Sequence, residues 1–114
     1  MSTQQCYKYF KAREILNDGG DEKEARKLIE ENIDEHPKHI PSYLLLAGMQ
    51  RNHEEYSAAM ATINAAMKNN HKGSGITDAK LQWWKASIYE DMEEYDTALK
   101  LMQQVVKAGR KTDK

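Results

Sequence analysis

Two stretches of this sequence repeat one pattern. HEEYSAAMATINAAM spans residues 53–67, and MEEYDTALKLMQQVV spans residues 92–106. Ala98 lies 39 residues after Ala59, and Ala59 lies 34 residues after Ala25. The five additional residues fall in the stretch KNNHKGSGI, whose glycines and serine are typical of a loop that accepts an insertion. The underlying period is therefore 34 residues, which indicates repeated supersecondary units rather than one irregular domain.

Glycine and proline divide the chain into pieces of helical length. Ala, Glu, Lys, Leu, Met and Gln dominate these pieces, and β-branched alternation over a strand length is missing. Asp21 with Glu24 has the spacing of a capping box, and Pro41 suits a first helical turn. Gly109, with two basic residues after it, suits a helix C-terminus. The sequence predicts an all-α fold, with helices at residues 4–17, 22–35, 41–52, 55–70, 77–91 and 95–109.

Length and charge restrict the class of protein. The chain has 114 residues, enough for one domain or a short stack of repeats, and its net charge is -1 with 31% charged residues. The near balance of charge argues against a nucleic-acid face. Cys6 is the only cysteine, so no internal disulfide is expected, which is typical of a reducing compartment. Neither a signal peptide nor a membrane span is recognisable, and we expect a cytoplasmic protein without membrane insertion.

A 34-residue helix-turn-helix period is that of the tetratricopeptide repeat, and this chain resembles that family over nearly its whole length. The matching positions are Tyr9, Ala12, Leu16, Gly20, Ala25, Ile29 and Pro37 in the first unit, Tyr43, Leu46, Ala47, Tyr56, Ala59, Ile63 and Ala66 in the second, and Ala86, Tyr89, Tyr95, Ala98, Met102 and Val105 in the third. Arg13, Lys85 and Gln50 depart from the family pattern. The resemblance implies three tandem repeats stacked as a right-handed α-solenoid, at about residues 6–39, 40–73 and 79–112.

The repeated positions have a physical reason. Ala25, Ala59 and Ala98 are expected where the two helices of a pair cross most closely, because a methyl group is about all that such a crossing admits. Tyr56 and Tyr95 are expected to begin the second helix of a pair and to cover the crossing from the side. A single helix pair buries too little apolar area to offset the entropy of ordering it. Each copy must therefore be stabilised by packing on the next.

No pattern in the chain is typical of a catalytic or metal site. His36, His39, His53 and His71 are scattered over helix ends and loops, without a partner cysteine or HExxH spacing, and we expect solvated loop residues. A metal held by His36 and His39 is the alternative. Ser74 lacks the lysine and the strand of a phosphate loop, and the acidic runs are typical of solvated helix faces. We predict no catalytic residues, no metal and no cofactor.

The pair Trp83-Trp84 is the sharpest local signal. Adjacent residues on a helix point about 100° apart, so at most one indole can face a packed core squarely. Leu81, Trp84 and Ile88 share helical spacing, so Trp84 is expected between helices and Trp83 toward the hollow of the stack. The alternative is that both rings cover the end of the third unit.

In proteins that this chain resembles, the first helix of each pair lines a concave groove that binds peptides. Gly48 would leave room there for close backbone approach. Aromatic and arginine anchors suit an extended or helical peptide, so we predict a non-enzymatic protein-interaction module. The groove positions carried over from the family are Tyr7, Phe10, Glu14 and Asn17 in the first unit, Leu44, Gly48, Arg51 and Asn52 in the second, and Lys80, Trp83, Ser87 and Glu90 in the third.

One group of such proteins holds the EEVD carboxylate terminus of heat-shock chaperones with lysine, asparagine and arginine side chains. At the corresponding positions this chain has Phe10, Glu14, Leu45, Lys80 and Trp84. Only Lys80 agrees, so a doubly charged carboxylate end would be poorly held. We expect no such binding.

Other functions stay open. The chain could be a self-associating structural unit, because the five residues after Gly109 are too few for a capping helix and the third unit could end in an open apolar face. A second copy, further repeats of a longer assembly protein, or the polar residues Lys85, Lys100 and Lys107 could each cover or neutralise that face. A small helical enzyme or a nucleic-acid binder is the remaining alternative.

Overall fold

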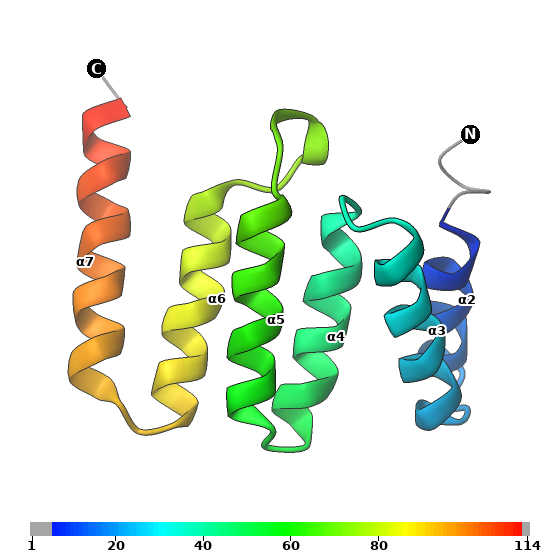
Figure 1. Ribbon diagram of the computed structural model, residues 1–114. Coiled ribbons are helices and arrows are strands. Elements are labelled where there is room, and N and C mark those ends of the chain that lie inside the picture. Colours follow the sequence, from blue (N-terminus) through cyan, green and yellow to red (C-terminus); the bar gives the residue numbers. More distant parts are fainter. Residues whose placement is uncertain (1–5, 113–114) are drawn as a thin grey trace.

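The computed structural model describes residues 6–112, with side chains for residues 6–107, and this part of the chain is all-helical (Figure 1). The α-helices are α2 (Tyr7–Asn17), α3 (Glu22–Glu35), α4 (Ile40–Asn52), α5 (Tyr56–Asn69), α6 (Asp78–Asp91) and α7 (Tyr95–Thr112). A short 3-10 helix, η1 (Lys72–Ser74), lies in the loop between α5 and α6. The predicted all-α class is confirmed, and no strand occurs among the described residues.

The predicted ends of the helices are nearly correct, and several have visible causes. The Asp21 carboxylate accepts a hydrogen bond from the backbone N–H of Lys23 at 2.9 Å, which caps α3, and Pro41 lies in the first turn of α4. The predicted end at Gly109 is wrong, because α7 continues through it to Thr112. A glycine inside a helix costs only about 1 kcal/mol relative to alanine, so one glycine need not end it. Residues 4 and 5 of the first predicted helix lie outside the described part of the chain.

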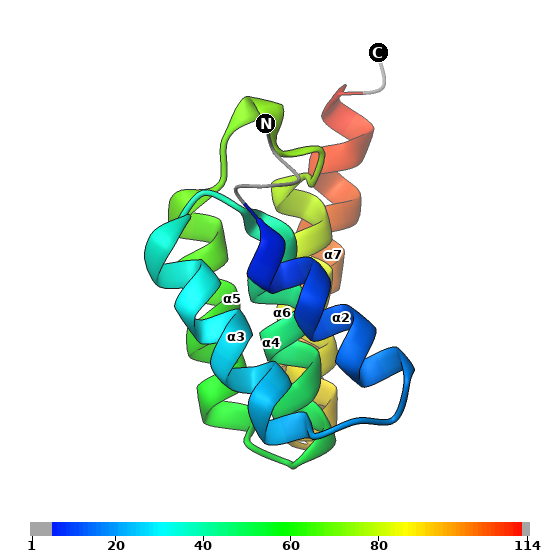
Figure 2. The ribbon, with the colours of Figure 1, turned by 90° about the vertical axis from the view of Figure 1, so that its right-hand side faces the viewer.

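Consecutive helices pack on one another in chain order. Every substantial helix-helix contact joins neighbours in the sequence, from α2 with α3 to α6 with α7. Figure 1 shows α3 to α7 side by side in this order, and Figure 2 shows α2 beside α3. The core is correspondingly elongated. One buried cluster joins α2, α3 and α4. A second, which we call the central cluster, joins α4, α5 and α6, so α4 contributes to both.

The three alanines at the predicted crossings are buried. Ala25 and Ala59 are completely inaccessible and Ala98 is 2% exposed, so the small side chains lie in tight contacts as expected. The two tyrosines differ. Tyr56 begins α5 and packs against the central cluster, whereas Tyr95 begins α7 and is 62% exposed. Tyr95 is more exposed than Tyr56 because, among the described helices, α5 has a helix on each side and α7 packs substantially only on α6.

A buried polar cluster joins α3 to the start of α4. The Asn32 side-chain amide donates to Ser42 Oγ at 2.9 Å, and Ser42 Oγ also lies 2.7 Å from His39 Nδ1. The His39 and Tyr9 rings pack edge to face, with their centroids 4.7 Å apart. His39 is therefore not the solvated loop residue that the sequence indicated. Burial, with a smaller contribution from the charge of His36, lowers the pKa of His39 below its ordinary value of 6.5.

The lowered pKa of His39 predicts a pH-dependent stability. The unfolded chain binds the proton more readily than the folded one, so the free energy of unfolding should fall as the pH drops through about 6.5 toward the pKa of folded His39. Urea unfolding between about pH 7.5 and 5.5 measures this loss, which His39→Gln should reduce. An unchanged slope in His39→Gln would contradict the assignment.

Candidate binding groove

Helices α4 and α6 present a hollowed surface on one side of the molecule. Three adjoining hollows of about 450, 540 and 330 Å³ share Trp84 as a lining residue. We call this surface the α4–α6 groove. It is lined by Leu16 of α2, by Leu44, Leu45, Gly48, Met49, Arg51 and Asn52 of α4, by Lys80, Trp83, Trp84 and Ser87 of α6, and at its ends by Glu22, Tyr56, Thr77, Ala79 and Asp91.

Seven of the twelve predicted groove residues line this surface, and all seven come from the second and third units. They are Leu44, Gly48, Arg51, Asn52, Lys80, Trp83 and Ser87. Glu90 is exposed but lines none of the hollows. The four residues predicted from α2, namely Tyr7, Phe10, Glu14 and Asn17, are exposed on another part of that helix and do not line the groove.

The prediction for α2 fails because its register differs by one residue. Ala12, Ala47 and Ala86 are all completely buried, and they lie 35 and 39 residues apart rather than 34 and 39. On this alignment Arg51 corresponds to Leu16, and Leu16 is the residue of α2 that lines the groove. A shift of one residue rotates a helical side chain by about 100°, which moves Asn17 away. Aligning the first-helix alanines, rather than those of the second helix, would have found Leu16.

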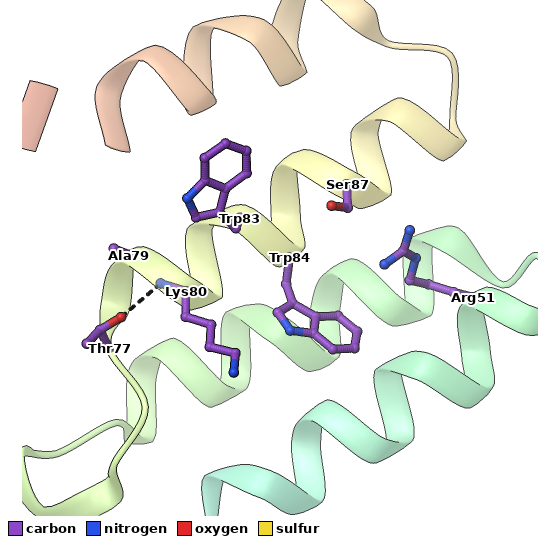
Figure 3. A pocket seen from close by; sticks show the side chains of 7 residues that line it. All are labelled: Arg51, Thr77, Ala79, Lys80, Trp83, Trp84 and Ser87. Carbon is purple, nitrogen blue, oxygen red and sulfur yellow. Dashed lines mark hydrogen bonds between the residues drawn. The ribbon is translucent and has the colours of Figure 1, made fainter. Parts of the chain in front are cut away.

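Trp84 lies at the centre of the groove. Its ring is half-buried, packs against the central apolar cluster and reaches across to α4, as expected for a residue between helices (Figure 3). A methyl group at Gly48 would lie 3.9 Å from Cη2 of Trp84, an ordinary van der Waals contact. Gly48 lines two of the hollows, and the room that it leaves for a ligand backbone stays a prediction.

Arg51 connects α4 to α6 beside this ring. Its Nε donates to Asp91 Oδ2 at 2.7 Å, and its guanidinium carbon lies 5.7 Å from the centroid of the Trp84 ring. The second distance is within the range of a cation–π interaction. Arg51 is thus committed to contacts within the protein. Its position is defined by them, and its charge is largely balanced by Asp91.

Trp83 and Lys80 are two exposed side chains that line the first hollow. Trp83 is 42% exposed, and Figure 3 shows its ring on the side of α6 away from α4. The Lys80 side chain is exposed and makes no ion pair within residues 6–107. The Lys80 backbone N–H is held by Thr77 Oγ1 at 3.1 Å, which caps α6 at the end of the first hollow (Figure 3). The first hollow therefore has an open indole on one side of α6 and an available ammonium group on the side of Trp84 (Figure 3).

Two further hollows lie outside the groove, one of about 720 Å³ beside Arg26 and Glu55 and one of about 520 Å³ on α7. No three His, Cys, Asp or Glu side chains among the described residues gather as a metal ion requires, and none of their helices is long and apolar enough to cross a bilayer. No family model, curated protein or solved structure matches the chain.

Proposed function

We propose that this chain is a stack of three tetratricopeptide-type helix pairs without catalytic activity, and that its α4–α6 groove binds a peptide segment of a partner protein. The pairs are α2 with α3, α4 with α5 and α6 with α7. Their packing in chain order and the buried alanines at repeated positions support the repeat.

The turns within the pairs support the same proposal. Gly19, Glu54 and Glu93 each have a positive φ, between 59° and 72°. In every case the next residue donates its backbone N–H to the carbonyl five residues earlier at 2.8 Å, from Gly20 to Ile15, from Glu55 to Gln50 and from Glu94 to Tyr89. This is the closure of a Schellman turn. Two of the three positions use glutamate, which is uncommon in this conformation, so the shared geometry is imposed by the packing of the pair.

The observation that carries the binding proposal is the exposure of Trp83 next to the half-buried Trp84. A 42% exposed indole in a hollow of about 450 Å³ offers apolar area that a ligand can cover. Aromatic and arginine side chains at the centre of a hollow are the usual anchors of protein-protein binding. The second, α2-facing hollow continues the surface past Gly48 to Leu16, which gives an extended peptide a path across α4.

The lining predicts the composition of the peptide. An apolar or aromatic side chain would cover the Trp83 and Trp84 rings, and an acidic side chain nearby would pair with Lys80. Arg51 would contribute little to charge recognition because Asp91 already occupies its Nε.

Selection of binders from a random peptide library, followed by affinity measurement on single peptides, tests the proposal. Trp83→Ala should weaken binding of a selected peptide by about tenfold or more, and Lys80→Glu should weaken acidic peptides most. Both side chains are exposed, so the circular dichroism spectrum of each variant should match that of the unchanged protein.

Tyr7→Ala is the matched control. It removes an aromatic ring that is 63% exposed on α2 and lines none of the three groove hollows. Affinity should be unchanged in this variant. Peptides that bind equally well to the unchanged protein and to Trp83→Ala would exclude the groove, and a loss only in Tyr7→Ala would move the site to α2.

A further inference from the structure

Helix α7 carries an open apolar face. Leu99 is 55% exposed and Val106 is 47% exposed, and with Met102 between them they line a shallow hollow of about 520 Å³. Among the described helices, α7 packs substantially only on α6 and stands at the edge of the row (Figure 1). Within residues 6–107, no side chain covers this face.

Equivalent faces within the same chain are covered by a helix. The alanine alignment pairs Ala98 with Ala59, and the side chains that follow on α5 pack in the central cluster, where Ile63 is completely buried. Helix α6 lies on that face of α5, just as α4 lies on α3. The counterparts of Leu99, Met102 and Val106 are Met60, Ile63 and Met67. The face of α7 is therefore of the kind that this architecture covers with an antiparallel helix.

We propose that the covering helix is α7 of a second copy, paired antiparallel about a two-fold axis near Met102. Two of the three charges that α7 carries up to Lys107 support this arrangement, the third being Lys100. Asp96 and Lys107 are eleven residues apart, about three helical turns, so they point to the same side of the helix. An antiparallel pair brings Asp96 of each copy near Lys107 of the other, whereas in a parallel two-fold pair the two residues lie on opposite flanks of the contact and do not meet.

The apolar residues of α7 are centred on nearly the same two-fold axis as its charged pair. Leu99 and Val106 are centred within about one residue of the midpoint between Asp96 and Lys107, so one two-fold axis pairs both sets. Two such faces would be close to the lower limit of specific interfaces, about 1,200 Å² in total. The dimer is therefore weak and dissociates on dilution.

The other end of the molecule is a poorer occupant. Stacking α2 of a second copy onto α7 would place Glu14 where α4 has Met49, 4% exposed, and α6 has Ile88, completely buried. Glu14 pairs with Lys11 at 3.1 Å on the surface of α2, and this pair would have to be buried against Leu99 and Val106. Burial of this ion pair is the cost of head-to-tail assembly, and the exposed rings of Tyr7 and Phe10 on the same helix offset only part of it.

Sedimentation equilibrium over about two decades of concentration tests the pairing. The unchanged protein should show a monomer-dimer equilibrium with no larger species. Val106→Glu and Leu99→Glu should each weaken the dimer by tenfold or more, since each introduces two charges into the apolar contact, one from each copy. Both side chains are about half exposed, so the monomer should stay folded, as its circular dichroism will show.

Exchanging the charges of Asp96 and Lys107, together with a matched control on α2, distinguishes the antiparallel dimer from head-to-tail assembly. Asp96→Lys should weaken the dimer, and Asp96→Lys with Lys107→Asp should restore it. Phe10→Glu places the same charge on the exposed face of α2, at a ring that is 45% exposed, and should leave the dimer intact. A protein that is monomeric at every concentration overturns the proposal. Species larger than a dimer that disappear in the Phe10→Glu variant would also overturn the proposal, in favour of head-to-tail stacking.

Discussion

Replacing Ile63 by alanine should lower the free energy of unfolding by roughly 2–5 kcal/mol, because the substitution leaves a cavity in a fully buried site. Ile63 is completely inaccessible and belongs to the cluster that joins α4, α5 and α6. Helix α5 has a neighbour on each side, so the cavity weakens two helix-helix contacts at once. In a fold where each helix packs only on its neighbours, stability is close to a sum of such contacts.

Urea denaturation followed by circular dichroism measures this effect. Asn64→Ala is the control, since Asn64 is the next residue of the same helix and is exposed. Its substitution should change the free energy of unfolding by no more than about 0.5 kcal/mol. A loss below about 1 kcal/mol in Ile63→Ala would mean that the site collapses around the cavity or that the cluster contributes little.

Replacing Ala59 by leucine should destabilise the protein by about 1–3 kcal/mol through overpacking. Ala59 is completely buried in the same cluster, at the position that the sequence repeats as Ala25 and Ala98. Alanine and leucine have similar helix propensities, so the loss reflects the space between the helices rather than the backbone. The additional carbons would have to push α5 away from its neighbours.

Ala61→Leu is the matched control, because it makes the same change two residues along α5 at an exposed position. Thermal or urea unfolding should show little loss in that variant. Equal stability of the Ala59→Leu protein and the unchanged protein would contradict the assignment of Ala59 to a close helix crossing.

The groove was only partly predictable. The residues of α4 and α6 were carried over from the resemblance to tetratricopeptide repeats, and those of α2 were misplaced. Ala12 lies 35 residues before Ala47, one more than the spacing of the second-helix alanines. The ion pair of Arg51 with Asp91 could not be predicted from the sequence either. Asp91 lies 40 residues further along the chain, and no local pattern connects the two.

His39 shows the same limitation. From the sequence it is one of several loop histidines, whereas in the structure Tyr9 and Ser42 enclose it from two different helices. Burial in that enclosure is the larger cause of its lowered pKa, and the charge of His36 is the smaller one.

The sequence alone determined the helices, their approximate ends and the small residues at the crossings. These depend on periodicity, capping and turn residues within a few positions of one another. Only the tertiary structure decided which side chains are available for contact. It placed Trp84 against α4, left Trp83 open and exposed the outer face of α7. The reason is geometric, because exposure depends on how each helix is rotated against its neighbours, and a shift of one residue turns a side chain by about 100°.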